Sequence, residues 1–145
     1  MAGDVVLGYD GRPGAQAALR TATTIAAAFQ RPLVIVFGYM PVQMGGEALD
    51  LARAVKEVGE RLTAEAVAAA KAIDPSVEVH VELVEDRPAE SMLRAAEEHD
   101  ALAIVVGGTD HGPIRGSLLG SVTYQVVHRS TRPVVVVPYE SDDEA

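Results

Sequence analysis

The sequence of 145 residues contains no cysteine. This absence excludes disulfide frameworks, zinc–thiolate sites, iron–sulfur clusters and thiol nucleophiles. A cysteine-free composition suits a reducing compartment, and we expect the protein in the cytoplasm.

Basic residues are scarce, with 12 Lys and Arg against 21 Asp and Glu and a formal net charge of −9. Affinity for nucleic acid depends largely on basic charge, so we expect no nucleic-acid partner. Long apolar runs are also missing, and none approaches the roughly 18 residues of a membrane span. Met1 to Asp4 carries no basic residue of the kind that begins a secretory leader. We therefore expect no membrane association.

Several catalytic motifs are absent as well. No Gly-Lys-Ser/Thr closes a glycine-rich loop, so a P-loop is excluded. Gly116 to Gly120 misses a Gly-x-Ser-x-Gly nucleophile elbow by one place. The histidines have no partners at metal-ligand spacing. We expect no catalytic residue and no metal site.

Short β-branched runs are what the chain does contain. Such runs are typical of strands buried on both faces of a parallel sheet. Val77–Leu83 alternates polar and apolar residues instead, which predicts an edge strand with one wet face. The four continuous runs are Val5–Leu7, Leu33–Phe37, Ala103–Val106 and Val134–Val137.

Apolar stripes at helical spacing separate these strands. Two further helices are predicted to open at Pro88 and after Gly120-Ser121. The order βαβαβαβαβ indicates right-handed crossovers, and ligands of such sheets bind outside the carboxyl ends of the strands. The first two stripes, both expected to face the core, are Ala18, Ala22, Ile25 and Phe29, and then Leu51, Val55, Val58, Leu62, Ala66, Ala69 and Ile73.

The segment from Val106 to Val122 is the most informative one. It leaves a buried strand, crosses a loop with four glycines and enters a helix at Gly120-Ser121. Glycine lets backbone approach a ligand closely, and a helix N-terminus offers unpaired N–H groups, so this pattern is typical of a phosphate cradle. The alternative is a surface loop with Ser121 as an ordinary N-cap.

The chain resembles the universal stress protein family over nearly its whole length. Nucleotide-binding members carry Gly, two residues, Gly, nine residues and then Gly-Ser or Gly-Thr. Gly107 and Gly120-Ser121 match this pattern, whereas Asp110 stands at the second glycine. Further matches are Gly8-Tyr9-Asp10-Gly11, Asp86-Arg87-Pro88-Ala89 and Arg132-Pro133.

The resemblance implies a site for ATP or a related adenine nucleotide. Asp10 would contact the adenosine part, although Asp10-Gly11 is also suited to a plain strand-to-helix turn. The backbone of Gly38 would meet adenine, and the residues after Gly120 would donate to phosphates. Arg12 and Arg115 are the basic residues expected near this crevice. The full set is Gly8, Tyr9, Asp10, Gly38, Gly107, Thr109, Arg115, Gly120, Ser121, Val122 and Thr123.

Asp110 places a carboxylate where phosphates are expected, and like charges at such range repel. Binding would be weakened unless the side chain turns to solvent or Mg²⁺ bridges it to the nucleotide. Asp110 therefore supports a second hypothesis, in which the protein has this fold but has lost its affinity for nucleotides and serves as a dimeric interaction protein.

Val134–Val137 has a consequence for assembly. An uncovered apolar edge strand tends to pair with another strand. The resemblance implies a homodimer through this strand, and the alternative is that a helix or the Met40 to Glu47 loop covers it.

Together these features predict a single doubly wound α/β domain over residues 1–138, followed by an acidic tail over residues 139–145. Its five-stranded parallel sheet is expected in the order 3-2-1-4-5 with helices on both faces. We expect a cytoplasmic, stress-related, ligand-controlled dimeric module that binds an adenine nucleotide at the C-terminal ends of the strands, with at most slow ATP hydrolysis.

Overall fold

The computed structural model describes residues 3–40, 45–108 and 120–139. None of the helices in these ranges combines the length and apolar character needed to cross a bilayer. In chain order the elements are β1 (Val5–Gly8), α1 (Pro13–Phe29), β2 (Leu33–Tyr39), α2 (Gly45–Ile73), β3 (Val79–Glu85), α3 (Pro88–Glu98), β4 (Ala103–Gly107), α4 (Ser121–Arg129) and β5 (Val134–Val137).

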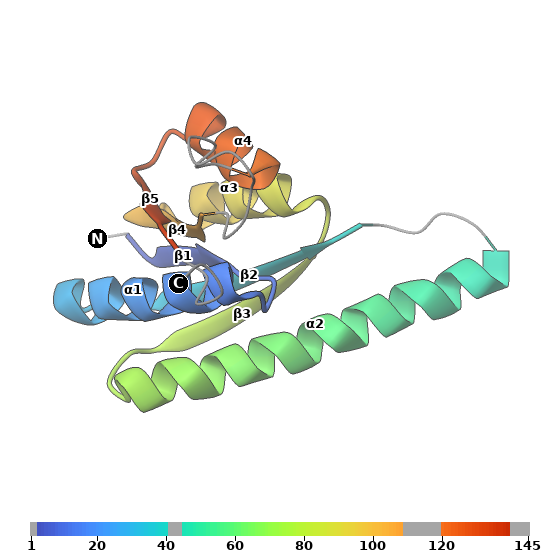
Figure 1. The fold of residues 1–145 in the computed structure, drawn as a ribbon, viewed down its shortest axis with the longest axis horizontal. Helices are drawn as coiled ribbons and strands as arrows, with labels where there is room; N and C mark the ends of the chain where they lie inside the picture. The colour runs from blue at the N-terminus through green and yellow to red at the C-terminus, as the bar shows by residue number, and fades with distance from the viewer. Residues whose placement is uncertain (1–2, 41–44, 109–119, 140–145) are drawn as a thin grey trace, which may run out of the picture.

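The strands form one parallel sheet in the order β3-β2-β1-β4-β5 (Figure 1). This confirms the predicted fold class and strand order. The segment expected to alternate is an edge strand, β3, and its pattern is more exposed than that of β1 or β4. β5 forms the opposite edge.

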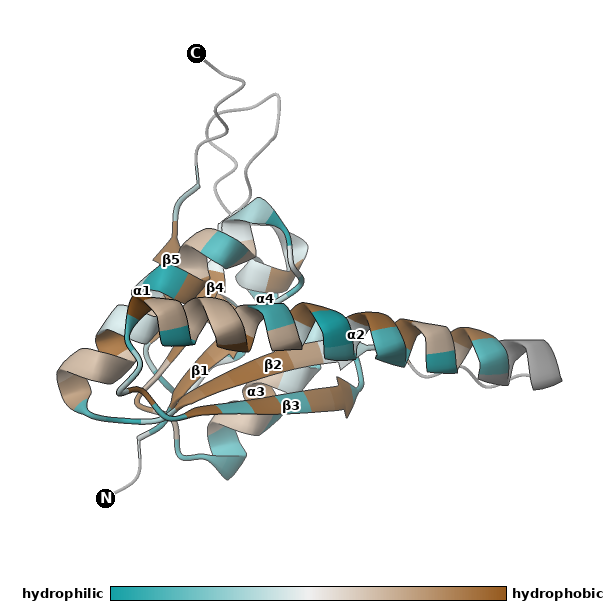
Figure 2. Cartoon of the chain, turned by 90° about the horizontal axis from the view of Figure 1, so that it is seen from below, coloured by the Kyte–Doolittle hydropathy of each residue, from teal (hydrophilic) through white to brown (hydrophobic). Residues whose placement is uncertain are grey.

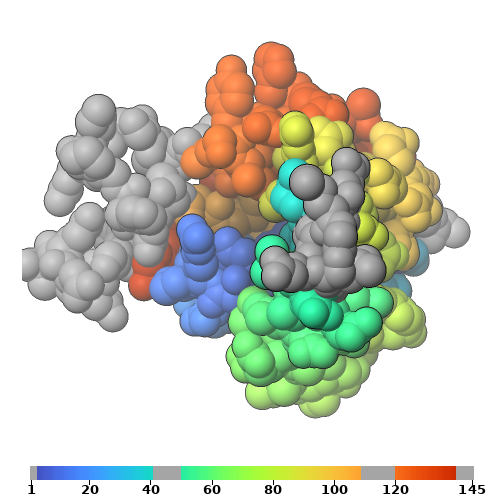
Figure 3. All heavy atoms as spheres, turned by 90° about the vertical axis from the view of Figure 1, so that its right-hand side faces the viewer, coloured from blue at the N-terminus to red at the C-terminus, as the bar shows by residue number. Residues whose placement is uncertain are grey.

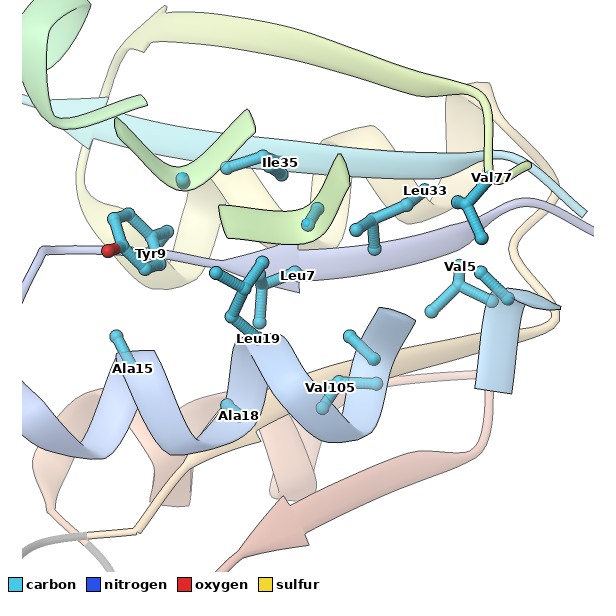
Figure 4. Close-up of a cluster of buried hydrophobic side chains, with 14 residues drawn as sticks. Val5, Leu7, Tyr9, Ala15, Ala18, Leu19, Leu33, Ile35, Val77 and Val105 are labelled. Carbon is cyan, nitrogen blue, oxygen red and sulfur yellow. The ribbon is translucent and has the colours of Figure 1, made fainter. Parts of the chain in front are cut away.

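The sheet is covered on both faces, which is why its central strands are continuously apolar. Successive side chains of a strand point to opposite faces. Val5 and Leu7 therefore lie in the core with α1 and α2, as Figure 4 shows, whereas Val6 lies in the core with α3 and α4. All three side chains are fully buried.

Two predicted core stripes are only partly correct. Phe29, the last residue of α1, is 61% exposed, and Leu51 of α2 is 58% exposed. Figure 2 shows why for α2, because its N-terminal part projects beyond the sheet and has no strand beneath it. The C-terminal part of α2 does face the core, where Ala66 and Ala70 are fully buried. Val58, Ala69 and Ile73 of the predicted α2 stripe are also exposed, whereas Gly59, Thr63 and Ala70 are buried. The predicted stripe was therefore both too long and displaced by about one residue from the buried face.

The expectation that Val134–Val137 is buried on both faces was wrong. Each of the four valines is only half-buried. β5 pairs with β4 alone, so its other edge has no strand beside it within the described chain.

The backbones of α1 and β4 approach each other closely at Gly107. A Cβ on Gly107 would lie 2.4 Å from the carbonyl oxygen of Gly14 and 2.5 Å from its carbonyl carbon. On the side of α4, the Thr123 hydroxyl donates a hydrogen bond of 3.1 Å to the carbonyl oxygen of Gly107. One residue at the end of β4 therefore fixes where α1 and α4 begin.

Gly107→Ala is expected to destabilise the protein by about 2 kcal/mol or more, because the added methyl group meets rigid backbone. Gly120→Ala is the matched control, since a Cβ there has nothing within 4 Å and the residue has φ −69°. We expect that variant to stay within about 1 kcal/mol of the parent. Urea unfolding without ligand measures both, and equal losses would contradict this account of Gly107.

His99 connects α3 to two other parts of the fold. Its Nδ1 lies 3.1 Å from Asp4 Oδ2, and its Nε2 is hydrogen-bonded to Glu82 of β3. Asp4 is also 3.5 Å from the Arg31 guanidinium. A neutral imidazole has one N–H, whereas the imidazolium has two and can donate to both carboxylates. The hydrogen bond to Glu82, opposed by desolvation and aided by Asp4, raises the pKa of His99.

The raised pKa of His99 predicts a pH-dependent contribution to stability. A group whose pKa is higher in the folded state stabilises the fold fully below its unfolded pKa of about 6.5 and loses this contribution as the pH rises through the folded pKa. The wild-type protein should therefore melt at a higher temperature than His99→Gln. This difference in melting temperature should be largest at about pH 5.5 and should decrease toward about pH 9. His80→Gln is the control, because it removes an exposed histidine with one carboxylate partner. A difference in melting temperature between wild type and His99→Gln that does not change with pH would refute this role of His99.

Candidate functional site

A cavity of about 330 Å³ opens at the carboxyl ends of β1, β2 and β4. This is where the strand order reverses, between β1 and β4, and where open α/β sheets bind ligands. Figure 3 looks onto this end of the molecule, where the start of α1 in blue lies across from α4 in orange. The size lies within the range of small-molecule sites.

Three helices begin at this cavity, and none has a side-chain cap. Their N-cap residues are Arg12, Arg87 and Gly120 for α1, α3 and α4. The first N–H groups that bond to the N-cap carbonyls belong to Gln16, Ser91 and Tyr124, so the N–H groups before them have no partner within their helices. Neither α1 nor α4 has an acidic residue in its first turn. The helix dipoles therefore make this cavity attractive to an anion.

The structure brings most of the predicted site residues together. Thr109 and Arg115 lie outside the described residues, as does Asp110. The other nine all line the cavity: Gly8, Tyr9, Asp10, Gly38, Gly107, Gly120, Ser121, Val122 and Thr123.

Other lining residues were not among the predicted site residues. Arg12 had been expected only near the crevice, and it lies in the lining. Met92 and Pro88 come from α3, where the apolar stripe and the helix start were recognised but not their position at the site. The remaining ones are Gly14, Ala15, Val36, Phe37, Val106 and Gly108.

Asp10 has a structural role in the turn after β1. Its Oδ1 accepts a hydrogen bond of 3.0 Å from the N–H of Arg12, and Gly11 between them has φ +83°. The turn considered as an alternative is thus present. The carboxylate is nevertheless 60% exposed at the cavity and remains accessible to a ligand.

Gly38 lies where α3 approaches β2. A Cβ at this position would be 2.5 Å from Ser91 Oγ and 3.0 Å from Pro88 Cα. A larger residue would therefore push the start of α3 away from the sheet. This packing gives the glycine at position 38 a structural reason.

The start of α4 differs from one expectation. The alternative in which Ser121 is the N-cap was wrong, because the N-cap is Gly120 and Ser121 is the first helical residue. Thr123 is buried and bonds to Gly107, so its hydroxyl serves packing. Its backbone, with those of Ser121 and Val122, supplies the unpaired N–H groups of the first turn.

Tyr9 forms part of the cavity wall and of the core. It is buried with α1 and α2, and its N–H donates to the Val36 carbonyl oxygen at 3.0 Å. Burial first, and then the charges of Glu65 and Asp10, raise the pKa of Tyr9. The phenol therefore stays neutral near pH 7.

The chemistry of the lining suits binding. Among the described lining residues, Asp10 and Arg12 are the charged ones, and Val36, Phe37, Pro88, Met92 and Val106 supply apolar surface. The described part of the chain holds no group of three or more His, Asp or Glu suited to a metal. Apolar surface beside unpaired N–H groups fits a ligand with an apolar body and an anionic group.

Comparison with known proteins agrees with this architecture. A model of the universal stress protein family matches residues 1–138. A universal stress protein of Thermus aquaticus is 35% identical over 136 residues, which cover 92% of this chain and 96% of the relative. One of Mycobacterium bovis is 32% identical over 133 residues, which cover 91% of this chain and only 44% of the relative. The chain thus spans less than half the length of that relative.

Solved structures show the same fold. A universal stress protein in complex with cAMP has a TM-score of 0.74 at 29% identity, covering 95% of this chain and 98% of the other. One from Archaeoglobus fulgidus in complex with dAMP has a TM-score of 0.68 at 25% identity, covering 92% and 96%. With the family match over residues 1–138, these comparisons establish that the chain belongs to the universal stress protein family.

Proposed function

We propose that this protein binds ATP or a related adenine nucleotide in the cavity and acts as a ligand-controlled module in a stress response. The observation that carries the proposal is the convergence of three uncapped helix starts on one cavity with an apolar wall. The cAMP and dAMP complexes of two similar proteins support the choice of an adenine nucleotide.

Each part of the lining has a role in this proposal. The apolar wall of Val36, Phe37 and Met92 receives the base, beside the backbone of Gly38. The Asp10 carboxylate accepts hydrogen bonds from the adenosine part. The N–H groups at the starts of α1 and α4 donate to phosphate oxygens.

The proposal is a binding function, with turnover at most slow. The described cavity has no base paired with a nucleophile, so its residues offer orientation and electrostatic stabilisation. Mg²⁺ would accompany ATP through phosphate oxygens. The cytoplasm is the proposed compartment, which a cysteine-free chain suits.

A homodimer through β5 belongs to the same proposal. β5 is an edge strand of four valines, each half-buried in the single chain. An apolar edge leaves N–H and C=O groups ready to pair with another strand. A second copy would continue the sheet across both chains.

Asp10→Ala is expected to weaken ATP binding by about 1 to 3 kcal/mol, because a ligand hydrogen bond to the carboxylate is lost. Glu98→Ala, an exposed carboxylate in the last turn of α3, removes the same charge and should leave the affinity unchanged. Calorimetry measures both variants, and melting curves check that Asp10→Ala still folds.

The wild-type protein tests the proposal directly. Denaturing the purified protein and separating the supernatant by anion exchange should reveal a co-purified adenine nucleotide. No such nucleotide, together with no calorimetric signal at millimolar ATP, would refute nucleotide binding and leave the interaction-protein hypothesis. Unchanged affinity in folded Asp10→Ala would remove Asp10 from the ligand site.

The dimer predicts a mass of twice 15.2 kDa at micromolar concentration. Sedimentation or light scattering measures it. A monomeric particle under these conditions would refute the dimer without bearing on nucleotide binding.

A further inference from the structure

We propose that the Arg12 guanidinium binds the phosphate group of the ligand, so that the cavity distinguishes a nucleotide from the uncharged nucleoside. This inference rests on the proposed nucleotide site. Arg12 is the cationic side chain among the described residues that line the cavity. It belongs to a chain with a net charge of −9, so this positive charge stands out against an acidic background.

The position of Arg12 places it where an anion is favoured. It is the N-cap of α1, and the next residues with free helical N–H groups, Gly14 and Ala15, also line the cavity. Gly14 packs against Gly107, whose carbonyl oxygen accepts the hydrogen bond from Thr123 of α4. The starts of α1 and α4 are therefore joined through one residue, and a phosphate bound between them lies next to the residue that begins α1.

The guanidinium of Arg12 is exposed and makes only a loose contact with another described residue. Its Nε lies 3.9 Å from Asp10 Oδ2, which is too long for a hydrogen bond, and the side chain is 80% exposed. Asp10 is held by a different group, the backbone N–H of Arg12 at 3.0 Å. Within the residues that the structure describes, moving the guanidinium toward a phosphate therefore breaks no hydrogen bond and leaves the turn intact.

The chemistry of arginine fits this role. Its planar fork can donate two parallel hydrogen bonds to phosphate oxygens, and such charge-assisted bonds are stronger than neutral ones. A nucleoside has no anionic group to receive them. Arg12 should therefore contribute to the affinity for AMP and little to that for adenosine.

The test compares adenosine and AMP on the same variants by calorimetry. Arg12→Ala should weaken AMP binding at least about tenfold and change adenosine binding less than about twofold. Arg12→Lys, which keeps the charge and loses the fork, should fall between wild type and Arg12→Ala for AMP.

Arg20→Ala is the matched control, because Arg20 is an exposed arginine two turns along α1 and its loss changes the net charge equally. It should bind both ligands as wild type does. Melting curves establish that each variant folds, and Arg12→Ala keeps the backbone N–H that holds Asp10.

The outcomes separate this inference from the proposed function. Unchanged AMP affinity in Arg12→Ala, or an equal loss for adenosine and AMP, would overturn the inference while nucleotide binding stands. An equal loss of AMP affinity in Arg20→Ala would also overturn it, since net charge would then be the cause. Wild-type protein that binds neither adenosine nor AMP would overturn both proposals.

Discussion

The close contact between the backbones of α1 and β4 is the constraint on which the site depends. Gly107 and Gly14 lie so near each other that neither a side chain nor a ligand fits between them. The first turn of α1 is thereby held against the end of β4, and Thr123 ties α4 to the same residue. A glycine here therefore has a structural reason before any ligand binds. The cavity exists because the helix starts are fixed around it by packing, which is how a rigid scaffold preorganises donors for an anion.

Much of the fold was predictable because short runs of β-branched and other apolar residues indicate strands that are buried on both faces. The β-branched runs that became β1, β2 and β4 are buried on both faces, and such burial requires helices on each side. The errors concern how far, and at which residues, one element covers another. Phe29 and Leu51 are exposed because periodicity does not say how far the partner element extends, and Ala69 is exposed beside buried Ala70 because periodicity locates a helix face only approximately. β5 lies at an edge as predicted, but its continuous valines predicted burial on both faces, and composition does not say how completely helices cover an edge strand.

The residues of the candidate site that could be predicted are those at the carboxyl ends of the predicted strands. Gly8 to Asp10, Gly38 and Gly107 come directly after buried runs, and the carboxyl ends of parallel strands meet at one edge. Met92 and Pro88 gave no such signal, because they reach the cavity through the packing of α3 across the sheet. Ser121 was ambiguous for a related reason: a Gly-Ser pair marks a helix start, but which residue caps it depends on backbone dihedrals that the sequence does not state.

To bind a nucleotide as proposed, this acidic protein must overcome its own average electrostatic field. At a net charge of −9 the long-range potential repels phosphate, so attraction has to be local. The helix starts supply one part of it, with N–H groups that do not titrate and whose positions are fixed by the backbone. Arg12 supplies the other part as an exposed and movable charge. Fixed dipoles accept any small anion that fits between them, whereas a bidentate guanidinium favours an oxyanion of phosphate geometry. In the proposed function this combination separates two tasks: packing would determine where the anion lies, and the Arg12 side chain would determine which kind of ligand is held.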